Sequence, residues 1–250
     1  MVWAAVAVLG LVVGSFLNVC IYRLPREESV VFPGSRCPGC GRKLAWYDLV
    51  PVWSYLWLRG CCRHCHMRIS PRYPVVEAAT SLAFLLLYHR LGSGGDFVTS
   101  AWFLSVLIVA TGIDLEHQII PNELVLAGLI GGVVLTAVFA PAAWGQRVVG
   151  ALAGHLSLLL VYVLSRGGMG MGDVKLAAVL GFFLGWPLVL LAIFSGFVLG
   201  ALAGTWLLAT RRKGRKDTLP FGPFLAVGAV VALGWGAELW AWYLRQFPLP

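Results

Sequence analysis

Charged residues are scarce in this chain: Asp, Glu, Lys and Arg make up 12% of its 250 residues, whereas hydrophobic residues make up 59%. A soluble domain of this size cannot bury so much apolar surface, because surface-to-volume scaling limits the buried fraction. The composition therefore predicts an all-α polytopic membrane protein. The net charge is +8, and we assign the basic excess to membrane topology rather than to nucleic-acid binding.

The first apolar run, 2–22, lacks two marks of a signal peptide: no basic residue precedes it and no small-residue cleavage site follows it. We therefore expect it to be retained as a membrane span. Because a helix needs about 20 residues to cross hydrocarbon, the run 174–209 is too long for one crossing, and we divide it between Trp186 and Pro187. The spans are expected at 2–22, 74–91, 97–114, 121–140, 146–165, 173–186, 188–209 and 222–244.

The basic residues predict the orientation of these spans. With both termini outside, all but three of the 19 Lys and Arg residues fall on the inner side, the exceptions being Arg90, Arg147 and Arg245. The positive-inside rule favours this orientation. We expect three parts: a first transmembrane helix in 1–24, a cytoplasmic insert in 25–73, and a transmembrane core of about seven helices in 74–250.

The insert carries two C-x-x-C pairs with 21 residues between them. This spacing is typical of a structural zinc site with four thiolate ligands and no open position. The expected ligands are Cys37, Cys40, Cys62 and Cys65. Cys61 is then not expected to be a ligand, because its neighbour Cys62 is the cysteine that forms a C-x-x-C pair with Cys65. Disulfides are the alternative, but they require an oxidising compartment, which a cytoplasmic insert does not occupy.

Each C-x-x-C pair should turn tightly, with its backbone N–H groups directed at sulfur. Such a turn favours a residue with positive φ directly after the second cysteine. Gly41 supplies this residue in the first pair, and His66 is a poorer substitute in the second.

The chain also lacks the motifs H-E-x-x-H and G-x-S-x-G, so the metalloprotease and serine hydrolase classes have no support. Two aspartates instead lie at expected membrane edges. Asp114 ends the apolar run 101–113, and Asp173 follows the glycine-rich turn 167–172. A carboxylate at the start of a membrane span is costly, and by default it indicates function.

Either aspartate alone could be an interfacial charge or a helix N-cap. Both are expected on the same face of the membrane, however, and together they favour a carboxylate pair. Two close carboxyl groups cannot both ionise, so one remains protonated and polarises a carbonyl while the other takes a proton from water. Glu116 lies about 200° around a helix from Asp114, so both cannot face the same partner. We expect His155 and Glu77 to be packed interior residues.

The segment Gly170-Met-Gly172-Asp173-Val-Lys175-Leu resembles the G-x-G-D signature of the type IV prepilin peptidases, which are membrane aspartic proteases. The segment 114–122 resembles the one that holds their first catalytic aspartate. Other segments also resemble the same family. They are residues 14–18 and 22–25, the two C-x-x-C pairs, residues 72–77 and residues 220–224. The resemblance implies that Asp114 and Asp173 are catalytic and that Gly170, Gly172 and Lys175 form the supporting turn.

The resemblance also implies a bacterial inner-membrane endopeptidase that removes the basic leader of prepilins or type II secretion pseudopilins. Cleavage would follow a glycine at the cytoplasmic face. Family members with the cysteine insert often also methylate the new N-terminus with S-adenosylmethionine, but no residue here is assigned to the methyl donor. Three alternatives stay open: a member with peptidase activity only, a proton-coupled transporter with carboxylates near the bilayer midplane, and an assembly factor that docks through its zinc module.

Overall fold

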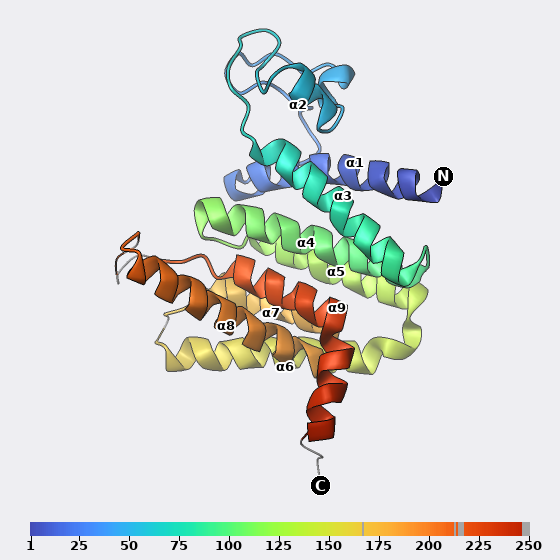
Figure 1. Ribbon diagram of the computed structural model, residues 1–250, viewed down its shortest axis with the longest axis vertical. Helices are drawn as coiled ribbons and strands as arrows, with labels where there is room; N and C mark the ends of the chain where they lie inside the picture. The colour runs from blue at the N-terminus through green and yellow to red at the C-terminus, as the bar shows by residue number, and fades with distance from the viewer. Residues whose placement is uncertain (167, 213, 215–217, 247–250) are drawn as a thin grey trace. The chain divides into compact units, whose positions relative to one another are not determined.

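The computed structural model describes residues 1–166, 168–212, 214 and 218–246, which form helices and loops with two isolated β-bridges (Figure 1). The expected all-α class is confirmed. Gly167, Lys213, Arg215 and Lys216, which entered the turn and topology arguments, lie outside the described residues. The long helices are α1 Val2–Arg23, α3 Arg72–Leu91, α4 Gly95–His117, α5 Asn122–Phe139, α6 Trp144–Leu164, α7 Met171–Leu184, α8 Leu188–Ala209 and α9 Gly222–Gln246. The short ones are η1 Leu24–Arg26, η2 Trp46–Leu49, α2 Trp53–Trp57 and η3 Pro141–Ala143.

Each expected span coincides with one long helix to within a few residues. Among the described residues, 6 helices are long and apolar enough to cross a membrane, and α3 and α7 are not in that set. The helix α7 has only 14 residues. It ends at Leu184, and α8 begins at Leu188, so the expected break at Trp186 and Pro187 is present. The chain is a multi-pass membrane protein.

The first compact unit, Met1–Val109, is built around the pair α1 and α3. Two glycines of α1 let these helices approach closely. A Cβ added to Gly10 would lie 2.5 Å from the Cα of Ser81, and one added to Gly14 would lie 2.7 Å from the Cα of Glu77. The hydroxyl of Ser81 also donates to the carbonyl of Ala7 at 2.9 Å. Small residues and interhelical hydrogen bonds are the usual means by which helices associate in lipid.

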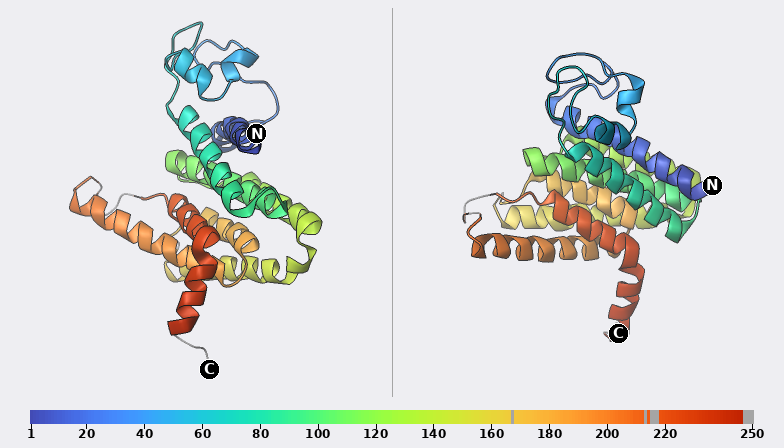
Figure 2. Two further views of the ribbon diagram at one scale, coloured as in Figure 1. Left: turned by 45° about the vertical axis from the view of Figure 1, so that its right-hand side comes forward. Right: turned by 45° about the horizontal axis from the view of Figure 1, so that its top comes forward.

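The second compact unit, Ala110–Pro250, has α7 as its central helix, in contact with α5, α6, α8 and α9 (Figure 2). Nine of the 14 residues of α7 are buried, as expected of a helix that is apolar on all sides. Its closest neighbour is α6, because a Cβ on Gly150 would lie 2.2 Å from the carbonyl oxygen of Gly181. The short helix is therefore held by protein on several sides, and its N-terminal turn carries Asp173.

Candidate active site and metal centre

Asp114 lies in the last turn of α4, where the chain leaves the helix. Gln118 closes that helix with φ 54°, and its N–H bonds to the carbonyl of Asp114 at 2.9 Å. The side chain of Asp114 is buried at 5% exposure. Its Oδ2 accepts the backbone N–H of Gly222, the first residue of α9, at 2.8 Å. A Cβ on Gly222 would lie 2.9 Å from that oxygen, so a glycine is needed for this approach.

Asp173 is the third residue of α7, and the helix N-cap is Gly170. The interpretation of Asp173 as a simple N-cap therefore does not describe the structure. Its side chain is 8% exposed, and within the described part of the chain its Oδ1 has no hydrogen-bond partner. The carboxyl groups of Asp173 and Asp114 are close enough for their charges to interact. The structure thus brings the two predicted aspartates together as a buried pair.

The two glycines before Asp173 have separate steric roles. A Cβ on Gly170 would lie 3.1 Å from Oδ2 of Asp173, so this glycine leaves room for the carboxyl group. A Cβ on Gly172 would lie 3.0 Å from the Cβ of Ile120 and 3.3 Å from its backbone nitrogen. The second glycine thus lets α7 start directly against the segment that follows α4. That contact brings the helix carrying Asp173 close to the end of the helix carrying Asp114.

Polar contacts around the pair join the same elements. Lys175 donates from Nζ to Oδ1 of Asn122 at 2.7 Å, which connects the N-terminal part of α7 to the first residue of α5. His155 of α6 lies with Nδ1 3.3 Å from the carbonyl oxygen of Val174, in agreement with an interior, hydrogen-bonded histidine. Glu116 is exposed whereas Asp114 is buried. The two acidic side chains of α4 therefore point in different directions, as expected.

Three contributors to this site were not identified as site residues from the sequence. They are Gly222, Ile120 and Asn122. The first lies in 220–224 and the others in 114–122, both of which entered the sequence analysis only as matches to a family pattern. The backbone N–H of Gly222 and the packing surface of Ile120 cannot be recognised from residue type, because every residue except proline has a backbone N–H and many have an apolar side chain. The sequence signal at Gly222 is a glycine at the start of an apolar run, directly after Pro220 and Phe221, and it was not used to predict a site residue.

The four expected cysteines of the insert come together in the first unit. The sulfur atoms of Cys37, Cys40, Cys62 and Cys65 all lie within 4.8 Å of one another, and Cys61 is not part of the group. The Sγ atoms of Cys37 and Cys65 are 3.7 Å apart. Tetrahedral zinc with Zn–S bonds of about 2.3 Å requires sulfur atoms about 3.8 Å apart. The geometry therefore fits a metal ion bound by four cysteines.

The two cysteine pairs adopt the same turn. Gly41 has φ 69° and His66 has φ 55°, so both positions take the positive φ expected from the sequence. Each of these residues donates its N–H to the carbonyl of the first cysteine of its pair, at 2.8 Å to Cys37 and 3.0 Å to Cys62. Backbone hydrogen bonds from Cys65, and then from His64, lower the pKa of Cys62 to about 6. These donors stabilise a thiolate, which is the form that binds metal.

Glu77 connects the insert to α3 within the first unit. It is buried, and its Oε2 accepts the backbone N–H of Val52 at 2.7 Å. Asn18 of α1 is fully buried and donates from Nδ2 to the carbonyl of Tyr73 at 3.1 Å. Glu77 therefore attaches the insert to α3, which is the interior packing role expected for it, and Asn18 joins α1 to the start of α3.

Comparisons with known proteins agree with these observations. The family model of the bacterial peptidase A24 N-terminal domain matches residues 8–91, and that of the type IV leader peptidase family matches residues 101–205. The first match covers the cysteine cluster, and the second covers Asp114 and Asp173. No solved structure matches the chain.

Curated relatives named prepilin leader peptidase/N-methyltransferase match along almost the whole chain. The protein of Aeromonas hydrophila is 34% identical, over 98% of this chain and 94% of its own length. That of Pseudomonas putida is 37% identical, over 94% and 91%. That of Bacillus subtilis (strain 168) is 33% identical, over 96% of both chains. On the strength of these matches and of the two domains that they cover, the chain belongs to the type IV leader peptidase family.

Proposed function

We propose that this protein is a membrane aspartic endopeptidase that cleaves the basic leader from type IV prepilins or type II secretion pseudopilins. The observation that carries the proposal is the buried pair of Asp114 and Asp173. Each aspartate lies close to a helix end, on α4 and α7 respectively. A transporter that relays protons would favour carboxylates near the middle of its spans, so the helix ends favour the peptidase.

Peptide hydrolysis by such a pair needs one ionised and one protonated carboxyl group. The ionised group takes a proton from water, whose oxygen attacks the carbonyl carbon of the scissile bond. The protonated group donates its proton to the carbonyl oxygen. When the intermediate collapses, the aspartate that took the proton from water gives it to the leaving nitrogen and the C–N bond breaks. The other carboxylate takes back a proton from a hydroxyl of the intermediate, which becomes the carboxyl carbonyl of the product. Gly222 fixes Oδ2 of Asp114 throughout these steps, while Oδ1 of Asp173 has no hydrogen-bond partner among the described residues.

The cysteine cluster is proposed to hold structural Zn²⁺. The ligands would be the four cysteines whose sulfur atoms cluster in the insert, Cys37, Cys40, Cys62 and Cys65. A zinc ion with four protein ligands has no position for substrate or water, so it supplies folding free energy rather than chemistry.

N-methylation of the new N-terminus is proposed as a second activity, because the relatives carry it in their names. Its methyl donor would be S-adenosylmethionine. The described residues contain no β-strand, and so they lack the glycine-rich turn between strand and helix that often binds such cofactors. No described residue is assigned to the methyl donor.

The protein is proposed to lie in the bacterial cytoplasmic membrane with both termini outside. The insert and the aspartate pair would then face the cytoplasm, where the basic leader of a substrate is expected. This orientation rests on the distribution of Lys and Arg.

The direct test is incubation of the purified full chain with a synthetic prepilin, with and without S-adenosylmethionine. Mass spectrometry of the product should show loss of the leader in both reactions, and a methyl group only when the donor is present. If the substrate stays intact in both reactions although the protein is folded and contains its metal, the proposed peptidase activity is excluded. Cleavage without methylation would leave a family member with peptidase activity alone.

A further inference from the structure

Among the exposed apolar side chains of the insert, five lie on the two neighbouring elements η2 and α2. Their exposed fractions are 80% for Trp46, 48% for Tyr47, 64% for Trp53, 63% for Leu56 and 71% for Trp57. We call these five residues the aromatic face. Surfaces with several large exposed aromatic side chains are unusual on soluble modules and indicate a binding surface. The inference from this face goes beyond the peptidase activity and does not depend on it.

The local structure directs these side chains outward. Trp53, Leu56 and Trp57 have the spacing i, i+3 and i+4 and therefore share one side of α2. Tyr55, on the same helix, points inward: its hydroxyl donates to the carbonyl of Ile69 at 3.4 Å. The helix α2 contacts η2, which carries Trp46 and Tyr47. The aromatic face is therefore built from two adjoining elements of a metal-binding module.

The turn between η2 and α2 is attached to α3. Val52 has φ 59°, which is strained for a β-branched residue, and the N–H of Trp53 bonds to the carbonyl of Pro51 across it at 2.6 Å. In this conformation the N–H of Val52 donates to Glu77 at 2.7 Å. Glu77 lies about 7.5 Å along the axis of α3 from its first residue. The aromatic face thus begins at the level of the first turns of α3, where Val75 is 62% exposed.

The charge of the insert indicates what covers this face. Residues 36–68 contain six basic residues and one acidic residue, Asp48, which forms an ion pair with Arg63 at 2.8 Å. All the basic side chains are exposed: Arg36, Arg42, Lys43, Arg59, Arg63 and Arg68. Such a surface attracts anionic lipid headgroups and repels a basic peptide.

We propose that the aromatic face inserts into the headgroup region of the membrane leaflet at which α1 ends and α3 begins. Trp and Tyr are enriched at this depth, because their rings are apolar and their N–H and O–H groups remain near water. Arg59, which is exposed and lies two residues after α2, then contacts lipid phosphates. The insert therefore lies on the membrane surface as an interfacial module, rather than standing free in solvent.

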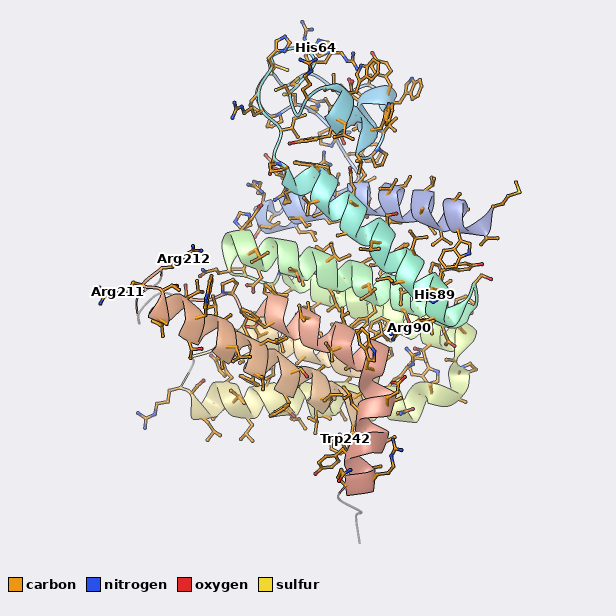
Figure 3. All side chains as sticks on the ribbon, in the orientation of Figure 1. His64, His89, Arg90, Arg211, Arg212 and Trp242 are labelled. Atoms are coloured by element: carbon orange, nitrogen blue, oxygen red, sulfur yellow. The ribbon has the colours of Figure 1, made fainter. Side chains whose placement is uncertain are left out.

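The experiment uses the full chain in nanodiscs of phosphatidylethanolamine and phosphatidylglycerol. A photoreactive phenylalanine analogue replaces Trp57 in one variant and Trp53 in a second. The matched control carries the analogue at His64, an exposed residue of the same insert at the end away from α1 and α3 (Figure 3). After illumination, mass spectrometry identifies what is attached at each position. Metal content shows that each variant keeps a folded insert.

Lipid adducts are expected at Trp57 and Trp53. No lipid adduct is expected at His64. Three results would overturn the proposal. The first is no lipid adduct at either Trp position in protein that retains its metal. The second is an equal yield of lipid adduct at His64. The third is an adduct to a protein chain, a second copy or a bound substrate, in place of lipid at Trp57.

Discussion

The backbone N–H of Gly222 donates to Oδ2 of Asp114 at 2.8 Å, joining the first residue of α9 to the last turn of α4. These residues are far apart in sequence, and the donor carries no side chain. The bond fixes the orientation of a buried carboxylate in a way that a flexible side-chain donor would not. Positioning of this kind is worth large factors in rate, because a displacement of 1 Å can cost roughly 10²-fold.

Gly222→Ala should therefore lower the rate of prepilin cleavage by roughly 10²-fold. The added Cβ would lie 2.9 Å from Oδ2 of Asp114, and one of the two must move. The measurement is kcat in nanodiscs or detergent, with thermal unfolding as a check on folding. Gly204→Ala is the matched control, because an added Cβ there has no atom within 4 Å. Equal activity of both variants would mean that Gly222 does not position Asp114 for catalysis.

Gly172→Ala should lower kcat by about tenfold, since the new Cβ pushes α7 away from Ile120 and displaces Asp173. Changing Ile120 to Gly in the same chain removes the Cβ at 3.0 Å and should restore part of the loss. Single and double variants are compared at saturating substrate. A double variant less active than expected from the two single changes would mean that steric contact is not the cause.

Cys62→Ser should lose the bound metal and disorder the insert, whereas Cys61→Ser should keep metal near stoichiometry. The reason is that Cys62 belongs to the sulfur cluster and Cys61 does not. Closed zinc sites contribute folding free energy directly, so a chelator should have the same effect as Cys62→Ser. Elemental analysis of the purified variants measures this. Equal metal loss in both would show that the ligand set is wrong.

A reporter fused after Lys216 should be cytoplasmic, and one fused after Arg245 should be external. The prediction follows from the accumulation of basic residues on one side of the expected spans. Reporter enzymes that are active on only one side of the membrane provide the measurement. The opposite labelling would place the aspartate pair on the wrong face for a cytoplasmic leader.

Much of the fold could be predicted because hydropathy alone determines where a chain enters lipid. The expected spans agree with the long helices, including α7. Its short length was expected because the run 174–209 was divided between Trp186 and Pro187. The turn geometry at Gly41 and His66 was also predictable, since the tight C-x-x-C turn requires a positive φ at a fixed position.

The remaining features depend on close approach of backbones, which has no signature in residue type. The N–H of Gly222, the surface of Ile120 under Gly172, and the hydrogen bond from Val52 to Glu77 all appear only once the helices are packed. The sequence indicated that Asp114 and Asp173 belong together, but the glycines and backbone groups that bring them together required the structure.

Asp114 and Asp173 share the hydrolytic work in the proposed mechanism, and substitution of each carboxyl group shows whether both are needed. Asp114→Asn and Asp173→Asn keep the size of each side chain but remove its titratable carboxyl group, and a synthetic prepilin is offered to each purified variant. Either change is expected to lower the cleavage rate by roughly 10²–10⁴-fold with the protein still folded, whereas Glu116→Gln is expected to have a milder effect. Cleavage at the normal rate by folded Asp114→Asn or Asp173→Asn would contradict the proposed mechanism.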